Sequence, residues 1–241
     1  MYALALLSAI FVAKWFIKKD NLPISNDLFD SYIWWAEIGV ILGARLGYIL
    51  FYDSNTTYYL TNPWQIFNPY VNGTYVGIAG MSYHGAFIGF IIASILFCKR
   101  KNISFWFITD IAVLGVSAAY VFGRIGNFFN QELVGRVTDV SWGIYVDGIL
   151  RHPSQLYEAF LEGIVVFLIL VYFRNRKKFD GQLAIMYGIF YTIARIIAEF
   201  YRQPDPQIGF IAGNWLTMGI LQSGVILVIC LVLYGIKSKK I

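Results

Sequence analysis

The stretch Trp215–Ile236 reads WLTMGILQSGVILVICLVLYGI and contains no charged side chain. A helix needs about 20 consecutive, mainly apolar residues to cross the hydrocarbon core of a bilayer. An uninterrupted run of this length and composition indicates a transmembrane helix. We therefore predict that Trp215–Ile236 spans a membrane.

The rest of the chain repeats this pattern. Of its 241 residues, 58% are hydrophobic and only 14% are charged, and the mean hydropathy is +0.61. These values exclude an ordinary water-soluble domain. Further apolar stretches run roughly over Met1–Ile17, Ile33–Phe51, Val76–Phe97, Phe105–Phe122, Leu156–Phe173 and Leu183–Phe200. The sequence therefore predicts an all-α integral membrane protein, a bundle of about seven transmembrane helices that forms a single domain over residues 1–241.

The basic residues predict the orientation of these spans. Clusters follow the first, third, fifth and seventh spans, at Lys14/Lys18/Lys19, Lys99/Arg100/Lys101, Arg174/Arg176/Lys177/Lys178 and Lys237/Lys239/Lys240, whereas the loop 53–72 contains no basic residue. Because cytoplasmic loops are rich in lysine and arginine, the N-terminus is predicted to lie outside and the C-terminus in the cytoplasm. The net charge of +5 thus reflects topology, and no nucleic-acid partner is expected. The loop region around 126–155 is predicted to be extracytoplasmic.

The cysteines and histidines argue against a metal site. Cys98 and Cys230 are too few and too far apart for a disulfide framework or a CxxC metal site. His84 and His152 lie in different loops, outside any strong metal-binding spacing. We expect neither a metal ion nor a cofactor.

The basic residues outside the four clusters are all arginines, namely Arg45, Arg124, Arg136, Arg151, Arg195 and Arg202. Arginine holds phosphate bidentately and stays charged where lysine more readily loses its proton. The arginines therefore suggest a phosphate ligand. The alternative is that they snorkel or pair with acids and serve only folding. That alternative is weaker for Arg45 and Arg195, which lie within apolar spans, because charge at membrane depth is costly and usually marks function.

A polar stripe follows the predicted span Leu183–Phe200. Its members are spaced four residues apart and share one helix face, and they are Tyr187, Tyr191, Arg195 and Glu199. Glu199 is predicted to pair with Arg195, and Arg202 lies one further turn along. A purely structural ion pair is the alternative interpretation.

The densest polar segment is Gly123–Arg136, GRIGNFFNQELVGR, at the predicted outer end of the fourth span. Its glycines free the backbone, and its polar residues lie between apolar neighbours. Such backbone at interfacial depth is tolerated where it lines a polar cavity. His84, near the outer end of the third span, is a candidate for acid–base work, although a lone histidine is more often a core residue.

These motifs together resemble the prolipoprotein diacylglyceryl transferase family. The resemblance covers nearly the whole chain and rests on five blocks in family order: Gly43–Tyr48 (GARLGY), Met81–Gly85 (MSYHG), Gly123–Gly135, His152–Glu158 (HPSQLYE), and Arg195–Arg202 with Pro204-Asp205. One departure is that family members begin with a short Trp-Tyr-Gly segment before the first span. This sequence begins Met1-Tyr2-Ala3-Leu4, so a family active-site tyrosine is expected to be missing from it.

The resemblance implies a transferase of the bacterial plasma membrane whose active site faces the periplasm. Its implied partners are membrane lipid, with phosphatidylglycerol as the diacylglyceryl donor, and preprolipoproteins, whose lipobox cysteine thiol becomes a thioether as glycerol phosphate is released. The implied phosphatidylglycerol-binding residues are Arg124, Gly135, Arg202 and Arg45. The implied catalytic residues are His84, Arg195, Glu199, Tyr191, Asn127 and Glu132.

A mechanism follows as a hypothesis. A cysteine thiol with a pKa of about 8.5 is mostly protonated at neutral pH, so both a base and a cationic clamp are needed. We predict that Arg124 and Arg195 hold the phosphate and that His84 is the base, with Glu132 or an arginine-bound water as alternatives. Glu199 is predicted to orient Arg195, and Glu132 with Asn127 to shape the headgroup pocket.

Two other functions compete with the transferase. An anion transporter or channel would also use buried arginines, but the chain shows no internal repeat of the kind that many transporters carry. An alcohol-phosphatidyl type of phospholipid transferase is disfavoured because its aspartate-rich metal motif is absent from the sequence.

Overall fold

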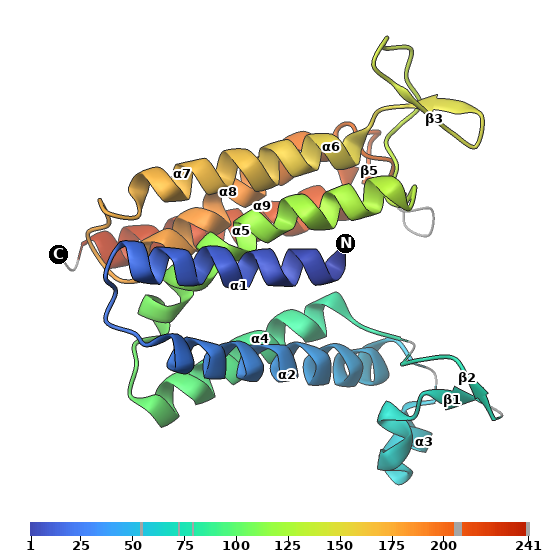
Figure 1. Cartoon of the computed structure of the whole chain (residues 1–241). Coiled ribbons are helices and arrows are strands. Elements are labelled where there is room, and N and C mark those ends of the chain that lie inside the picture. The colour runs from blue at the N-terminus through green and yellow to red at the C-terminus, as the bar shows by residue number, and fades with distance from the viewer. Residues whose placement is uncertain (54, 72, 79, 205–208, 240–241) are drawn as a thin grey trace. The chain divides into compact units, whose positions relative to one another are not determined.

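The structure is a computed structural model that describes residues 1–53, 55–71, 73–78, 80–204 and 209–239 (Figure 1). Most described residues are helical. The elements are α1 (Tyr2–Lys19), α2 (Asn26–Phe51), α3 (Thr56–Thr61), the 3₁₀ helix η1 (Pro63–Phe67), β1 (Tyr70–Val71), β2 (Thr74–Tyr75), α4 (Tyr83–Lys101), α5 (Phe105–Phe129), β3 (Ile144–Val146), β4 (Ile149–Arg151), α6 (Ser154–Glu158), the π-helical η2 (Ala159–Val165), α7 (Val166–Phe173), α8 (Gln182–Glu199), β5 (Phe210–Ala212), β6 (Leu216–Thr217) and α9 (Met218–Ser238).

The chain forms two compact units. The large unit comprises Met1–Pro23 and Trp106–Ile241, and the small unit comprises Ile24–Phe105. Each strand pair, β1–β2, β3–β4 and β5–β6, is a short antiparallel hairpin. That residues 1–241 act as a single domain stays a prediction.

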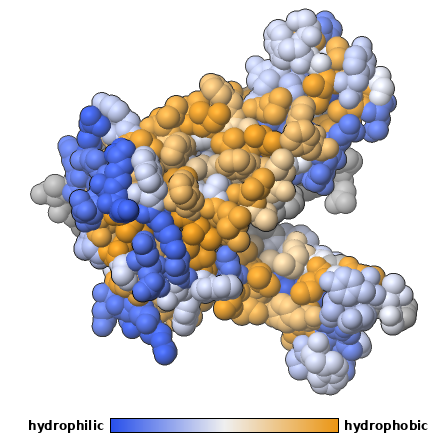
Figure 2. Space-filling view, viewed as in Figure 1, coloured by the Kyte–Doolittle hydropathy of each residue, from blue (hydrophilic) through white to orange (hydrophobic). Residues whose placement is uncertain are grey.

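Four helical segments are long and apolar enough to cross a membrane: α2, α5, the continuous helix Ser154–Phe173 formed by α6, η2 and α7, and α9. In the most apolar window of α9, only 11% of the residues are buried within the protein. Figure 2 shows hydrophobic side chains over the sides of the helices and hydrophilic ones gathered at their ends. Apolar side chains exposed in this way require a lipid environment, because water would not tolerate so extensive a patch. The structure therefore confirms a mainly helical protein with several candidate membrane spans.

Helix α8 lies at the centre of the large unit. It packs against α9, α7 and η2. Its apolar side chains Leu183 and Met186 join a buried cluster with Phe16 of α1, Leu114 of α5 and Leu170 of α7. This packing fixes α8 against three other helices, so the polar side chains further along it are held in place.

The small unit is built on the close approach of α2 and α4. Glycines recur every fourth residue on the facing sides, at Gly39, Gly43 and Gly47 of α2 and at Gly85 and Gly89 of α4. A Cβ atom added at any of these positions would collide with the backbone of the opposite helix. In membranes, such small residues allow helix backbones to pack closely and gain dispersion contacts. The glycine spacing therefore determines how α2 and α4 pair.

Three expected boundaries are wrong. Helix α2 begins at Asn26, capped by Ser25, and not near Ile33. The helix predicted over Val76–Phe97 begins only at Tyr83, because Gly77 and Gly80 adopt positive φ angles of 74° and 77°. These left-handed conformations end regular structure, and Ser82 then caps α4 by accepting a hydrogen bond from the Gly85 N–H at 3.2 Å.

The region around 126–155 is also only partly a loop. Helix α5 continues through residues 126–129, the hairpin β3–β4 occupies residues 144–151, and α6 begins at Ser154. The glycines of the polar segment Gly123–Arg136 thus begin inside a helix. Gly126 lies against Met1, and its lack of a side chain serves packing rather than backbone freedom.

Candidate active site

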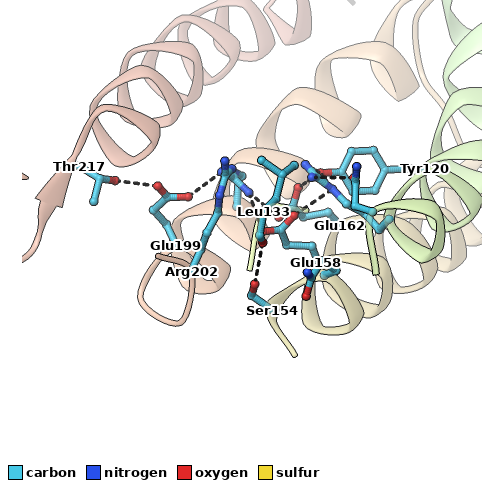
Figure 3. Close-up of polar contacts among 12 residues, drawn as sticks. Tyr120, Leu133, Ser154, Glu158, Glu162, Glu199, Arg202 and Thr217 are labelled. Atoms are coloured by element: carbon cyan, nitrogen blue, oxygen red, sulfur yellow. Dashed lines mark hydrogen bonds and ion pairs between the residues drawn. The ribbon is translucent and has the colours of Figure 1, made fainter. Parts of the chain in front are cut away.

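The candidate active site is a buried network in the large unit, in which one carboxylate joins two arginines. Figure 3 shows its acids Glu158, Glu162 and Glu199. Glu158 lies 2.9 Å from Arg124 Nε through its Oε2 and 3.1 Å from Arg195 Nη1 through its Oε1. Arg124 comes from α5, Glu158 from α6 and Arg195 from α8. The Glu158 side chain is fully buried, and those of Arg124 and Arg195 are 14% and 10% exposed. A carboxylate with both oxygens on guanidinium groups fixes the distance between the two cations.

Two further carboxylates complete the network. Glu199 lies 2.6 Å from Arg195 Nη2 and accepts a hydrogen bond from the Thr217 hydroxyl at 2.9 Å. Glu162 lies 3.6 Å from Arg195 Nη1 and accepts a hydrogen bond from the Tyr120 hydroxyl. Arg195 is therefore in contact with three carboxylates and is held on several sides.

Tyr120 links the two arginines by a second route. Its hydroxyl accepts a hydrogen bond from Arg124 Nε at 2.8 Å while it donates to Glu162. Its ring also lies edge-on to Tyr191, with centroids 5.5 Å apart. Arg124 Nη1 has a looser contact, 3.5 Å from the Asn127 amide oxygen. That Arg124 nitrogen is thus the donor of the network most readily turned toward a ligand.

The local helix geometry explains why these acids share one site. Glu158 and Glu162 are four residues apart, a spacing that places two side chains on the same helix face. They lie where α6 passes into the π-helical η2, and Gly163 in η2 packs closely against Val121 of α5. π-Helical turns within α-helices are frequent at functional sites. Burial of these acids is tolerated because guanidinium groups compensate their charge.

The polar segment after α5 forms the rim of the network. Asn127 donates a hydrogen bond from Nδ2 to Glu132 Oε2 at 2.9 Å, and Gln155 donates from Nε2 to the Glu132 carbonyl oxygen at 2.6 Å. Ser154 donates to the Leu133 carbonyl oxygen at 3.2 Å. The Glu132 residue itself is exposed. The start of α6 therefore fixes the backbone of this segment and leaves an exposed acid beside Asn127.

Gly135 and Arg202 meet at the end of α8. They form an isolated antiparallel bridge, and Arg136 donates to the carbonyl oxygens of Arg202 at 3.0 Å and of Glu199 at 3.2 Å. A side chain at Gly135 would collide with the His152 backbone carbonyl. Gly135 is therefore required by a close backbone approach, and Arg136 has a structural role.

Most of the predicted site residues meet in the large unit. The network and its rim contain Arg124, Asn127, Glu132, Tyr191, Arg195 and Glu199, with Gly135 and Arg202 joined at its edge. The predicted ion pair between Glu199 and Arg195 is confirmed. Asp205 lies outside the described residues.

Two predicted residues, Arg45 and His84, belong to the small unit. Arg45 is buried and donates from Nε to the Ile66 carbonyl oxygen at 2.5 Å and from Nη1 to the Gly80 carbonyl oxygen at 3.2 Å. His84 is exposed, and its Nδ1 lies 3.4 Å from the Tyr52 hydroxyl.

Three network residues were not predicted as site residues. They are Tyr120, Glu158 and Glu162, all within or beside predicted apolar spans. The sequence could have indicated Glu158 and Glu162. Two acids four residues apart in an apolar span are energetically unfavourable within a membrane, and they therefore indicate function as the arginines do. The sequence gives no such indication for Tyr120, because tyrosine is common in apolar helices. Among the described residues, no group of three or more His, Cys, Asp or Glu side chains is arranged to hold a metal ion.

Comparison with known proteins places the chain in a family. A family model described as prolipoprotein diacylglyceryl transferase matches residues 1–236. The phosphatidylglycerol–prolipoprotein diacylglyceryl transferase of Aliarcobacter butzleri (strain RM4018) is 78% identical over 239 residues, covering 99% of this chain and 88% of that protein.

Two other relatives carry the same name. The protein of Wolinella succinogenes is 63% identical over 223 residues, covering 92% of this chain and 82% of its own length. That of Campylobacter jejuni subsp. jejuni serotype O:23/36 is 59% identical over 242 residues, covering 100% and 89%. The two-arginine network therefore lies in a chain that belongs to the prolipoprotein diacylglyceryl transferase family.

Proposed function

We propose that the two-arginine network is the phosphate site of the reaction that this family carries out. The chain is a transferase that moves the diacylglyceryl group of phosphatidylglycerol to the cysteine thiol of a prolipoprotein. The observation that carries the proposal is the bridging of Arg124 and Arg195 by the buried Glu158. Two guanidinium groups held at a fixed spacing match a phosphodiester, which accepts hydrogen bonds through two oxygens.

The reaction requires stabilisation of a leaving phosphate. The cysteine sulfur attacks the terminal glyceryl carbon of the diacylglyceryl group, a carbon–sulfur bond forms, and the carbon–oxygen bond to phosphate breaks. The electron pair of that bond leaves with glycerol phosphate, and the thiol proton passes to a base. Arg124 and Arg195 offset the charge that develops on the leaving oxygen, an electrostatic role that typically contributes about 10²–10³-fold to the rate.

The acids divide into different roles. Glu158 spaces the two arginines, and Glu199, held by Thr217, orients Arg195. With all three carboxylates ionised, two guanidinium groups would face three negative charges. Glu162 has the longest guanidinium contact, at 3.6 Å, and Tyr120 holds its other oxygen. We assign the proton that balances the network to Glu162, because neighbouring buried carboxylates do not all ionise together. The network then carries no net charge before an anionic phosphate binds.

The remaining site residues are assigned roles from their surroundings, and Tyr191, implied to be catalytic, is given a positioning role. His84, which is exposed, is the proposed base, and Glu132, exposed beside Asn127, is the alternative. Tyr191 is proposed to position Tyr120 through its ring contact. Gly135 and Arg202 are proposed to shape the headgroup site. The implied assignment of Arg45 to phosphatidylglycerol is untested and is not carried into this proposal, because the Arg45 guanidinium already donates to the carbonyl oxygens of Ile66 and Gly80.

We also propose the membrane arrangement. Seven helical spans cross the bacterial plasma membrane, with the N-terminus outside and the C-terminus in the cytoplasm. Supporting this, basic side chains occupy the last turns of α1, α4 and α9. Helix α5 starts just after the basic cluster of α4, and Arg124 lies near its far end. By this topology the two-arginine network faces the periplasm.

The test is direct transfer. The purified chain in detergent is incubated with phosphatidylglycerol and a peptide carrying the lipobox cysteine, and both peptide mass and glycerol phosphate are followed. We expect the mass to rise by one diacylglyceryl group with equimolar glycerol phosphate. A peptide with Cys→Ser must stay unmodified. Release of glycerol phosphate without peptide modification would identify a phospholipase instead and overturn the proposal.

A further inference from the structure

A second site lies in the small unit, where a cavity of about 590 Å³ opens among the short elements between α2 and α4. Volumes of about 300–1,000 Å³ are typical of pockets that bind ligands. Its aromatic and amide lining comprises Tyr48, Tyr58, Tyr59, Tyr70, Gln65 and Asn68. We call it the tyrosine pocket. All of these described lining residues belong to the small unit.

Arg45 supports the walls of the tyrosine pocket. It donates hydrogen bonds to the carbonyl oxygens of Ile66, in η1, and Gly80, in the segment that precedes α4. Its guanidinium carbon lies 5.3 Å from the ring centroid of Tyr59 and 5.8 Å from that of Tyr48. One buried cation thus ties two separate chain segments and two rings together. The pocket is built before any ligand arrives, which lowers the entropic cost of binding.

The charge of this region argues against an anionic lipid headgroup. Residues 53–82 contain no lysine or arginine, and their single ionisable acid, Asp53, also lines the pocket. The one guanidinium group present is already bonded to two backbone carbonyls. The large unit, by contrast, offers two arginines in one network. A phosphate is therefore far better accommodated there.

The chemistry of the lining favours a polypeptide. Tyrosine, asparagine and glycine dominate surfaces evolved to recognise proteins, because tyrosine supplies contact area at low entropic cost and amides bond to backbone groups. The side-chain amide of Asn68 is held in place by two hydrogen bonds: it donates to Gln65 at 2.6 Å and accepts from the Tyr70 N–H at 3.0 Å. Among the described residues β1 pairs only with β2, so the hairpin offers an edge to which an extended chain can add.

We infer that the tyrosine pocket binds an extended, uncharged segment of the polypeptide that carries the acceptor cysteine. This inference rests on the proposed function, which supplies that polypeptide as a substrate. The rings of Tyr58, Tyr59 and Tyr70 hold its side chains, and the amides of Gln65 and Asn68 bond to its backbone. The pocket therefore contributes to the selection of the acceptor, whereas the two-arginine network holds the donor.

Photo-crosslinking tests the inference without requiring catalysis. A photoreactive phenylalanine derivative replaces Tyr70 in the full chain, and a labelled lipobox peptide with Cys→Ser serves as the probe because it cannot be lipidated. We expect saturable crosslinking that excess unlabelled peptide prevents and phosphatidylglycerol does not. The same derivative at Phe87, an exposed residue of α4 outside the pocket, is the matched control and is expected to give no saturable crosslink.

Kinetics provide the second measurement. Asn68→Ala and Tyr59→Ala are expected to raise the KM for the peptide about tenfold, as loss of an aromatic or amide anchor typically does, with kcat and the KM for phosphatidylglycerol unchanged. If phosphatidylglycerol prevents the crosslink and its KM rises instead, the pocket binds lipid and the inference is wrong. Normal transfer with no saturable crosslink at Tyr70 also overturns it. Absence of transfer by the unmodified chain, with crosslinking intact, would instead overturn the proposed function alone.

Discussion

The two units each bury arginine within apolar helices, but they compensate its charge differently. In the large unit, Arg124 and Arg195 face carboxylates at 2.6–3.6 Å. In the small unit, Arg45 bonds to two backbone carbonyls and packs against tyrosine rings. Carbonyl dipoles and the quadrupoles of aromatic rings attract a guanidinium group but do not neutralise its charge. Carboxylates neutralise it and can be exchanged for another anion.

This difference separates a ligand site from a structural support. An anionic ligand can replace one carboxylate on a guanidinium, provided that the carboxylate finds a proton or another partner. The carbonyl oxygens of Ile66 and Gly80, which accept hydrogen bonds from Arg45, are fixed parts of the backbone and cannot be exchanged in this way. We therefore expect substitution of an arginine to lower the transfer rate in the large unit and the stability in the small unit.

Among the acids of the network, substitution of Glu158 should lower the transfer rate most. Glu158→Gln keeps the shape of the side chain but removes the charge that spaces Arg124 and Arg195. We expect transfer to fall about 10²-fold, since small misplacements of reacting groups cost rate on this scale. Initial rates at saturating peptide and phosphatidylglycerol measure it.

Glu162→Gln is the matched control, because it changes the neighbouring acid in the same way. If Glu162 carries the balancing proton, its amide variant should transfer at a rate close to that of the unmodified chain. Equal losses in the two variants would contradict the separate roles given to these acids.

In the small unit, Arg45→Gln should affect stability more than chemistry. The part-buried carbonyl groups of Ile66 and Gly80 lose their donor, and a fully buried acceptor left unsatisfied would cost about 1–3 kcal/mol. We expect a lower unfolding temperature in detergent, with the KM for phosphatidylglycerol unchanged. A raised KM for phosphatidylglycerol at unchanged stability would instead place Arg45 in the lipid site.

Two helix caps provide the smallest and most closely matched comparison. Thr217 caps α9 and also donates to Glu199, whereas Ser82 caps α4 alone. Thr217→Val and Ser82→Ala should each lower the unfolding free energy by about 1 kcal/mol, the usual contribution of a cap.

Only Thr217→Val should also slow transfer, because Glu199 loses a hydrogen bond that holds it on Arg195. Thermal unfolding and initial rates of both variants separate the two effects. A slower Ser82→Ala enzyme of unchanged stability would show that capping of α4 itself matters for turnover.

Much of this arrangement could be predicted from the sequence. Apolar length predicted the helices, and the four-residue spacing of Arg195 and Glu199 predicted their ion pair. Boundaries were harder, because Val76–Met81 is apolar enough for a span yet contains two glycines with positive φ. Hydropathy contains no information on backbone conformation, so it predicts the start of α4 too early in the sequence.

The network itself could be predicted only in part. The arginines stood out because charge within apolar spans is conspicuous, and Glu158 and Glu162 could have been recognised by the same argument. Their convergence could not, since it depends on how α5, α6 and α8 pack and on the π-helical turn in η2. The link through Tyr120 depends on the same tertiary packing.

The central claim is that Arg124 and Arg195 act as one phosphate site, and a double-mutant cycle on transfer tests it most directly. Arg124→Gln and Arg195→Gln are each expected to lower the rate about 10²–10³-fold, the usual loss for a charge-stabilising group. The double variant should be little slower than the worse single variant, because residues that act as a unit are strongly non-additive. Losses that multiply, or an Arg124→Gln enzyme at nearly the unmodified rate, would contradict the claim.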